Sequence, residues 1–105
     1  MVRGDIHAIK LPPRRGRVQH GRRYAVVVQA DPLLALSTVV VCPTSLSARG
    51  ASFHPAVAVG DEETLVLCEM VGAVDVRALG AQVGHASAEE LQSIEDGLRL
   101  VLALS

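Results

Sequence analysis

Residues 37–42 read STVVVC, and this run decides the fold class because its centre, residues 38–41, is an unbroken series of β-branched residues. It predicts a buried strand. Pro43 is expected to end that strand or to place it at a sheet edge, and the polar run TSLSARGAS at 44–52 predicts a loop. A second run of the same kind, YAVVVQ at 24–29, predicts a neighbouring buried strand.

Weaker strand signals continue outward from this pair. They fall at residues 6–10, 53–59 and 64–70, with 71–76 as a continuation of the last and a short strand at Val83. Short strands at this spacing are typical of a small closed or half-closed barrel.

The C-terminal segment predicts an amphipathic helix. Ser87 and Glu90 form a capping box at its start. Apolar residues then recur at helical spacing, at Leu91, Ile94, Leu98 and Leu102. Gly97 lies inside the helix, where it costs about 1 kcal/mol relative to Ala, so it indicates a close packing contact. The fold class predicted is mainly β, with one C-terminal helix packed on the strands.

The composition favours one globular domain spanning 1–105. Half of the residues are apolar, Tyr24 and Phe53 are the only aromatic ones, and the core is therefore expected to be aliphatic. No apolar run approaches the roughly 18 residues of a membrane span, and no signal-peptide centre follows the N-terminus, so a cytoplasmic protein is expected. Cys42 and Cys68 are interpreted as two buried thiols rather than a disulfide. Without CxxC or HxxxH spacing, a zinc site has little support.

The charge is divided unevenly along the chain. Residues 1–50 carry eight Arg or Lys against two Asp, whereas 51–105 carry two Arg against nine Asp or Glu. This asymmetry favours a polyanion partner on one face. The alternative is that the two halves interleave in space and their fields cancel.

The order of the motifs resembles the MazF/PemK family of toxins. Arg3-Gly4-Asp5-Ile6 resembles the family's RGDI opening, residues 23–28 resemble its RPxVV strand, and residues 39–45 resemble its VVVPxTS strand end. The closing strand and helix are also similar. The resemblance implies an SH3-like β-barrel, a homodimer, and metal-independent cleavage of single-stranded RNA at short sequences without a cofactor. It also implies a cognate MazE-like antitoxin whose acidic tail folds into the RNA groove.

By this resemblance, Arg23 and Thr44 correspond to the catalytic Arg and Thr. Cleavage by attack of a 2′-hydroxyl needs a base, an acid and a donor that stabilises charge on the phosphorus. The planar guanidinium of Arg23 suits the last role, and Thr44 is expected to position the phosphate. Ser45 is an alternative to Thr44. Without a catalytic role, Arg23 would be a surface or ion-pair residue and Thr44 would start a turn.

Further candidates surround this pair. His20 is a candidate general base because the ordinary pKa of histidine lies near neutrality. Glu69 is a second candidate, since it lies where the family has its Asp-Gln segment. The cases for His7, His54 and His85 are weaker. Contacts to RNA phosphates or bases are expected from Arg14, Arg15, Arg17, Gln19, Arg22 and Ser45. The alternative is a basic loop that is only solvated, which would have the same sequence pattern.

Some positions depart from the family pattern. Tyr24 replaces the Pro that follows the catalytic Arg in the family. Leu67 lies where one branch of the family has a catalytic Arg, and Met70 lies where the family usually has Gln. These departures leave open a second function, a catalytically weakened module that binds antitoxin or RNA without cutting. A gyrase-poisoning toxin is disfavoured, because that branch relies on a Trp near its end and this chain has none.

Overall fold

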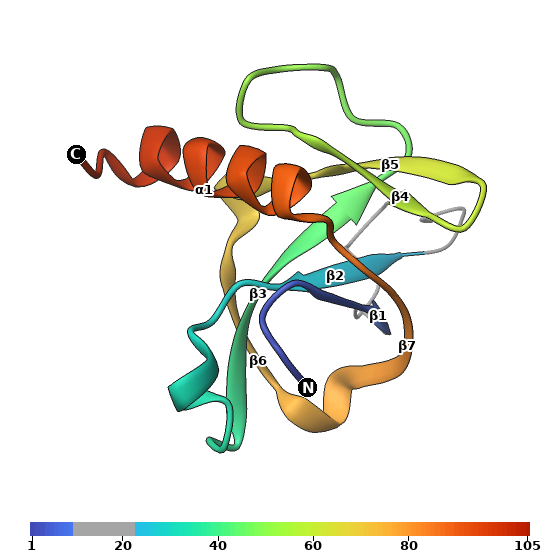
Figure 1. Ribbon diagram of the computed structural model, residues 1–105, viewed down its shortest axis with the longest axis vertical. Coiled ribbons are helices and arrows are strands. Elements are labelled where there is room, and N and C mark those ends of the chain that lie inside the picture. The colour runs from blue at the N-terminus through green and yellow to red at the C-terminus, as the bar shows by residue number, and fades with distance from the viewer. Residues whose placement is uncertain (10–22) are drawn as a thin grey trace, which may run out of the picture.

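The computed structural model describes residues 1–9 and 23–105, which form a curled, half-barrel β-sheet with one helix across its open side (Figure 1). The helix is α1 (Ala88–Leu102). The strands are β1 (Asp5–Ile9), β2 (Tyr24–Val27), β3 (Thr38–Ser45), β4 (Ala56–Val59), β5 (Glu62–Val66), β6 (Gly72–Asp75) and β7 (Leu79–His85). Short 3-10 turns lie at η1 (Asp31–Leu33), η2 (Cys68–Met70) and η3 (Val76–Ala78). The predicted fold class, mainly β with a C-terminal helix, is confirmed.

The strands follow the order β4-β5-β3-β2-β1-β7, and β6 pairs with β3 beside this path. All of the pairings are antiparallel. β3 is the longest strand and has three partners: its first half pairs with β6, its centre with β2, and its end, Thr44 and Ser45, with Val66 and Leu65 of β5. This strand therefore joins the two parts of the curled sheet.

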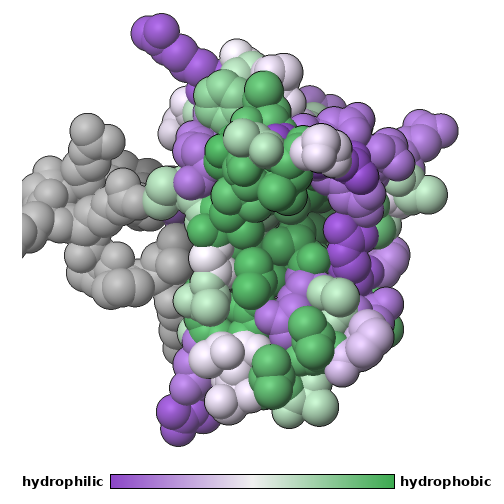
Figure 2. All heavy atoms as spheres, turned by 90° about the vertical axis from the view of Figure 1, so that its left-hand side faces the viewer, coloured by the Kyte–Doolittle hydropathy of each residue, from purple (hydrophilic) through white to green (hydrophobic). Residues whose placement is uncertain are grey.

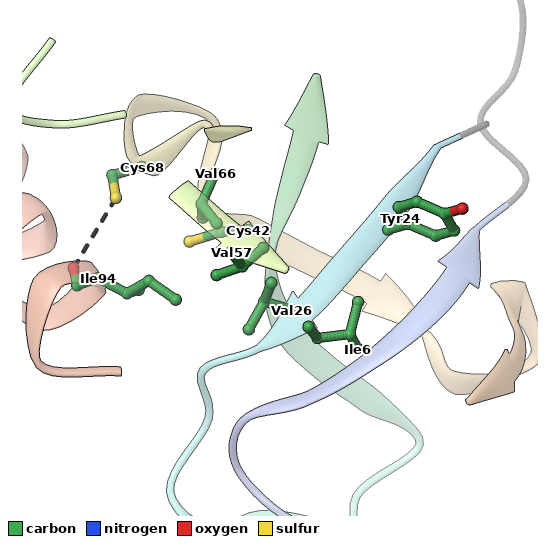
Figure 3. Packing of buried hydrophobic residues seen from close by; sticks show 8 residues of the cluster. All are labelled: Ile6, Tyr24, Val26, Cys42, Val57, Val66, Cys68 and Ile94. Atoms are coloured by element: carbon green, nitrogen blue, oxygen red, sulfur yellow. Dashed lines mark hydrogen bonds between the residues drawn. The ribbon is translucent and has the colours of Figure 1, made fainter. Parts of the chain in front are cut away.

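Two predicted strand ends were wrong. Pro43 does not end its strand, because β3 changes partner there: the Pro43 carbonyl accepts from the Leu67 amide at 2.8 Å, and the strand continues to Ser45. The strand expected at 64–70 instead ends at Val66. The next residues turn as η2, and the Cys68 side chain packs against α1, where its thiol lies 3.8 Å from the Ile94 carbonyl (Figure 3).

The core lies between the concave face of the sheet and α1. It contains Ile6, Tyr24, Val26, Cys42, Val57, Val66, Cys68 and Ile94 (Figure 3). A second apolar cluster lies on the other face of the same strands, at Ile9, Ala25, Val27, Val39 and Val41. Burial on both faces explains why the two central strands are apolar at consecutive positions instead of alternating. The expectation of an aliphatic core is confirmed.

The two cysteines are buried and free, as the sequence predicted. The neighbouring Cys68 thiol and burial raise the pKa of Cys42 well above its ordinary value, so Cys42 stays a neutral thiol. Both side chains are fully buried and pack in the core as small side chains.

Helix α1 begins and packs as predicted. The Ser87 hydroxyl accepts from the Glu90 amide at 3.1 Å, while the Glu90 carboxylate accepts from the Ser87 amide at 2.8 Å. Gly97 is buried against η2, and a Cβ placed there would lie 2.7 Å from the Cys68 sulfur. The close contact expected at this glycine is therefore present.

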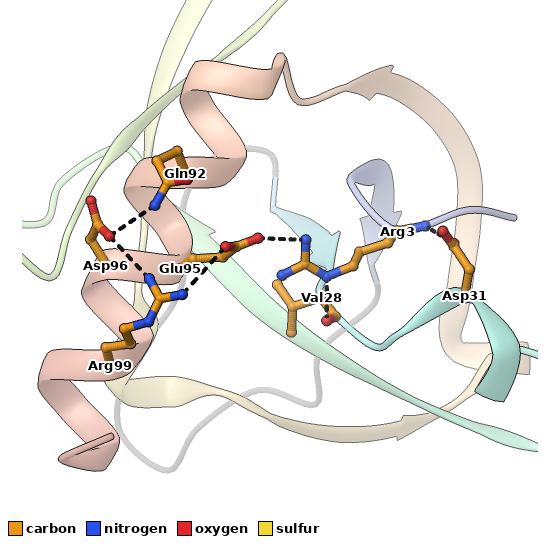
Figure 4. A network of polar contacts seen from close by, with 7 residues as sticks. All are labelled: Arg3, Val28, Asp31, Gln92, Glu95, Asp96 and Arg99. Carbon is orange, nitrogen blue, oxygen red and sulfur yellow. Dashed lines mark hydrogen bonds and ion pairs between the residues drawn. The ribbon is translucent and has the colours of Figure 1, made fainter. Parts of the chain in front are cut away.

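A polar network fixes the N-terminal segment against α1 (Figure 4). The Arg3 guanidinium donates to the Val28 carbonyl at 3.1 Å and to the Glu95 carboxylate at 2.9 Å, while the Arg3 amide donates to Asp31 at 2.7 Å. The side chain that opens the RGDI motif thus links the end of β2 to the helix. Within the part of the chain that the structure describes, no helix has the length and apolar character needed to cross a membrane.

Candidate functional site

Arg23 lies at the edge of a hollow next to the start of β2. The hollow measures about 380 Å³ and is lined by Ala8, Ile9, Arg23, Tyr24 and Val83. The Ile9 amide donates to the Arg23 carbonyl at 3.2 Å, so the backbone of Arg23 is held by β1. Among residues 1–9 and 23–105, no group accepts a hydrogen bond from its half-buried guanidinium. That cation is therefore available to an anion placed in the hollow.

Thr44 lies across from the residue that follows Arg23. Its hydroxyl oxygen accepts a hydrogen bond from the Tyr24 amide at 3.3 Å, and its side chain is fully buried. Tyr24 stands where the resembling family has Pro, which has no N–H to donate. With Tyr24 at this position the peptide carries an N–H, and the Thr44 hydroxyl oxygen accepts its hydrogen bond. The structure thus brings Thr44 next to the Arg23–Tyr24 peptide, with its hydroxyl oxygen already bonded.

Ser45 is the more accessible of the two hydroxyl residues. It is half-buried, and its oxygen accepts from the Ser47 amide at 3.2 Å and lies 3.4 Å from the Ser47 hydroxyl. The Ser45 oxygen thus forms a turn bond to the residue two places on. Both hydroxyl groups lie on the last two residues of β3, where this strand passes from β2 to β5.

Glu69 belongs to a separate cluster in η2. Its carboxylate lies 2.8 Å from Nε2 of His54, and Nδ1 of His54 lies 2.6 Å from the Arg49 carbonyl oxygen. The bond to the Arg49 carbonyl, followed by the bond to Glu69, raises the pKa of His54 above its ordinary 6.5. Sequence reasoning missed this partnership, since the two residues lie on different elements and no spacing rule links them.

A second hollow, of about 490 Å³, adjoins the one at Arg23 and shares Tyr24 and Val83 with it. Asp61 and Glu62, at the turn between β4 and β5, line its far side. Acidic residues from the C-terminal half therefore line a hollow that shares two residues with the one at Arg23. Which interpretation of the charge asymmetry holds stays a prediction, because most basic residues of the N-terminal half fall outside the described residues.

The other predicted site residues lie outside the described residues. These are His20, Arg14, Arg15, Arg17, Gln19 and Arg22. No group of three or more His, Cys, Asp or Glu side chains with the geometry to hold a metal ion occurs within the described ranges 1–9 and 23–105.

The described residues form a curled sheet with one C-terminal helix across its open side, and Thr44 at the end of β3 is bonded to the residue that follows Arg23. Residues 2–102 match the profile of the family described as PemK-like, MazF-like toxins of type II toxin–antitoxin systems. The chain belongs to this family.

Similar proteins agree with this assignment. Rv3098A of Mycobacterium tuberculosis, a protein named provisionally as a toxin, is 29% identical over 106 residues, which cover 99% of each chain. A mycobacterial endoribonuclease solved in complex with its cognate antitoxin has a TM-score of 0.82 at 18% identity and covers 100% of this chain and 97% of its own. A MazE–MazF structure from Deinococcus radiodurans has a TM-score of 0.80 at 23% identity, with 100% and 97% covered. These structural likenesses establish the fold.

Proposed function

We propose that this chain, as one toxin domain over 1–105, is an endoribonuclease that cleaves single-stranded RNA without a metal ion or cofactor. The observation that carries the proposal is the guanidinium of Arg23 in its hollow, which has no acceptor among the described residues, with Thr44 hydrogen-bonded to the adjoining peptide. The solved relatives named endoribonucleases support the same activity.

In the proposed reaction, the 2′-oxygen of the RNA attacks the adjacent phosphorus and the bond from phosphorus to the 5′-oxygen breaks. The products are a 2′,3′-cyclic phosphate and a free 5′-hydroxyl. A base takes the proton of the 2′-hydroxyl, and an acid returns one to the leaving oxygen. Arg23 stabilises the charge that develops on the phosphoryl oxygens and is the candidate acid.

Thr44 and Ser45 are the proposed phosphate-positioning hydroxyls. The oxygen of Thr44 accepts from Tyr24 and retains its own O–H for donation, while Ser45 is the more exposed. His20 and Glu69 remain the candidate bases. Because the Glu69 carboxylate is paired with His54, acting as a base would require Glu69 to exchange that bond for one to RNA. Arg14, Arg15, Arg17, Gln19 and Arg22 are proposed to bind the RNA strand.

The proposed partners are RNA, a cognate MazE-like antitoxin and a second copy of the chain, all in the cytoplasm. Figure 2 shows apolar side chains gathered on the face that carries the end of α1. Leu100, Leu102 and Leu104 at this end are each at least half exposed. An exposed apolar face of this kind favours a protein–protein interface, and we propose that it contributes to a homodimer.

The test incubates pure protein with a long single-stranded RNA in EDTA. Discrete cuts ending in cyclic phosphate are expected, and Arg23→Ala is expected to lower the rate roughly 10²–10³-fold, the scale of removing one transition-state donor. Arg77→Ala is the matched control, because Arg77 is 88% exposed and paired with Asp75 far along the chain from β2. An Arg23→Ala protein that cuts at the wild-type rate would overturn the proposed chemistry.

A binding module without cleavage is the second candidate, and the full burial of Thr44 is the observation that favours it. Retention of RNA in a filter-binding assay with no cut ends would support this second function over the first.

A further inference from the structure

His54 is enclosed by hydrogen-bond acceptors. Its side chain is 11% exposed, Nδ1 faces the Arg49 carbonyl at 2.6 Å, and Nε2 faces both Glu69 carboxylate oxygens at 2.8 and 3.0 Å. A carbonyl and a carboxylate only accept hydrogen bonds, so both ring nitrogens have to donate. A neutral imidazole carries a single N–H and could satisfy one partner alone. The geometry is therefore that of the doubly protonated ring.

The cation connects two segments that are distant in sequence. Arg49 belongs to the loop 46–55, which follows directly from Thr44 and Ser45, and Glu69 belongs to η2. The run 46–50 is mostly exposed and is held at its start by the Ser47–Ser45 bond and at Arg49 by the His54 ring. The turn at His54 is itself fixed, because its amide donates to the Ala51 carbonyl at 3.0 Å. The ring of His54 thus ties the middle of the loop to the body of the fold.

The groups that face the ring are few. Glu69 and Cys68 come from η2, and the Phe53 ring, with its centroid 4.6 Å away, comes from the loop itself. Among residues 1–9 and 23–105, the groups that favour the charged ring are the Arg49 carbonyl, the Glu69 carboxylate and the Cys68 thiol, whereas burial opposes its charge.

We propose that His54 is a positioning residue: as a cation it clips the loop 46–55 to η2 through Glu69, and so sets the placement of the Thr44–Ser45 strand end that faces RNA. The effect on RNA rests on the proposed ribonuclease function, whereas the clip itself does not. The clip is complete below pH 6.5 and opens as the pH rises through the elevated pKa of His54 in the folded protein. Arg49, the exposed cation of the loop, is released with it.

NMR titration of the full chain tests the clip without RNA. The ¹⁵N–¹H signal of Gly50 reports on the Arg49 carbonyl, because both belong to one peptide group. In the wild type this signal is expected to titrate together with His54, above pH 6.5, and Glu69→Gln is expected to lower the pKa of His54. In His54→Gln the Gly50 titration is expected to vanish. A His54 that titrates at or below 6.5, or a Gly50 signal that ignores it, would overturn the clip.

Cleavage kinetics test the consequence. His54→Gln is expected to raise KM at pH 6 roughly fivefold, the scale of one hydrogen bond, with kcat little changed, and to remove the rise of wild-type KM at high pH. His85→Gln is the matched control, since it breaks another His–carboxylate pair, with Asp5, away from this loop. A fall in kcat with KM unchanged would refute a positioning role. Absence of cleavage by the wild type would count against the proposed function, while the NMR result would still decide the clip.

Discussion

The contact between Gly97 and Cys68 allows a prediction with opposing contributions. Gly97→Ala in a helix interior would ordinarily stabilise the protein by about 1 kcal/mol. Here the new methyl group would lie 2.7 Å from the Cys68 sulfur and 3.4 Å from the Phe53 Cα atom, whereas ordinary contacts between such atoms are about 3.5–4 Å. Cys68 is fully buried, so its sulfur has no open space into which to move. Overpacking of this kind costs about 1–3 kcal/mol.

The net expectation is a loss of about 1 kcal/mol in the free energy of unfolding, or roughly 4–8 °C in Tm. In a Cys68→Ala background the sulfur is gone, and the nearest remaining contacts are the Phe53 Cα atom at 3.4 Å and the Cβ atom of residue 68 at 3.5 Å. The same Gly97→Ala change is then expected to stabilise by about 1 kcal/mol, giving a coupling of about 2 kcal/mol. Urea unfolding followed by far-UV circular dichroism measures all four proteins, at one protomer concentration. Equal effects of Gly97→Ala in both backgrounds would refute the packing argument.

Three further predictions concern the helix cap, acid stability and RNA affinity. Ser87→Ala removes the capping box and is expected to lower the free energy of unfolding by about 1 kcal/mol in urea; an unchanged midpoint would contradict this. Burial opposes ionisation of Asp5, but the bonds from the Val2 amide and the His85 ring outweigh it and lower the pKa of Asp5 below 3.8. The contribution of Asp5 to the free energy of unfolding is therefore present above pH 3.8 and is lost as the pH falls through its lower folded-state pKa. Asp5→Asn should therefore make the free energy of unfolding fall less steeply as the pH is lowered through this range. A steeper fall would contradict the argument. Replacing the carboxylates of the hollow that adjoins the one at Arg23, with Asp61→Asn and Glu62→Gln together, is expected to tighten binding of a non-cleavable 2′-deoxy strand roughly two- to fivefold in fluorescence anisotropy. Weaker binding would mean that these acids contact the strand favourably.

Local sequence signals predicted the elements whose stability is local. The β-branched run at 38–42 and the capping box at Ser87 were both found, because each depends on neighbours within a few residues. The extension of β3 through Pro43 could not be predicted, since it depends on the Leu67 amide from another strand. For the same reason, the sequence did not predict that the chain turns after Val66.

In the candidate site, too, some features could be predicted from the sequence and others could not. The resemblance assigned Arg23 and Thr44 to one site, and the structure bonds the Thr44 hydroxyl to the amide of Tyr24, the residue after Arg23. Their catalytic roles remain predictions. The burial of Thr44 and the pairing of Glu69 with His54 arise where segments 15 or more residues apart meet, so no local pattern could predict them.

The pairing of β1 with β7 has a consequence for the order of events during synthesis. β1 pairs with β7 (Leu79–His85), and the Asp5 carboxylate bonds to His85, which is made 80 residues later. Val83 of the same late strand forms a wall of the hollow at Arg23. Because contacts between distant parts of a chain form only once both parts exist, the hollow cannot be complete on a nascent chain that has not yet extended past β7. The hollow at Arg23 can therefore form only after the chain has been synthesised past His85, however early its other walls are made.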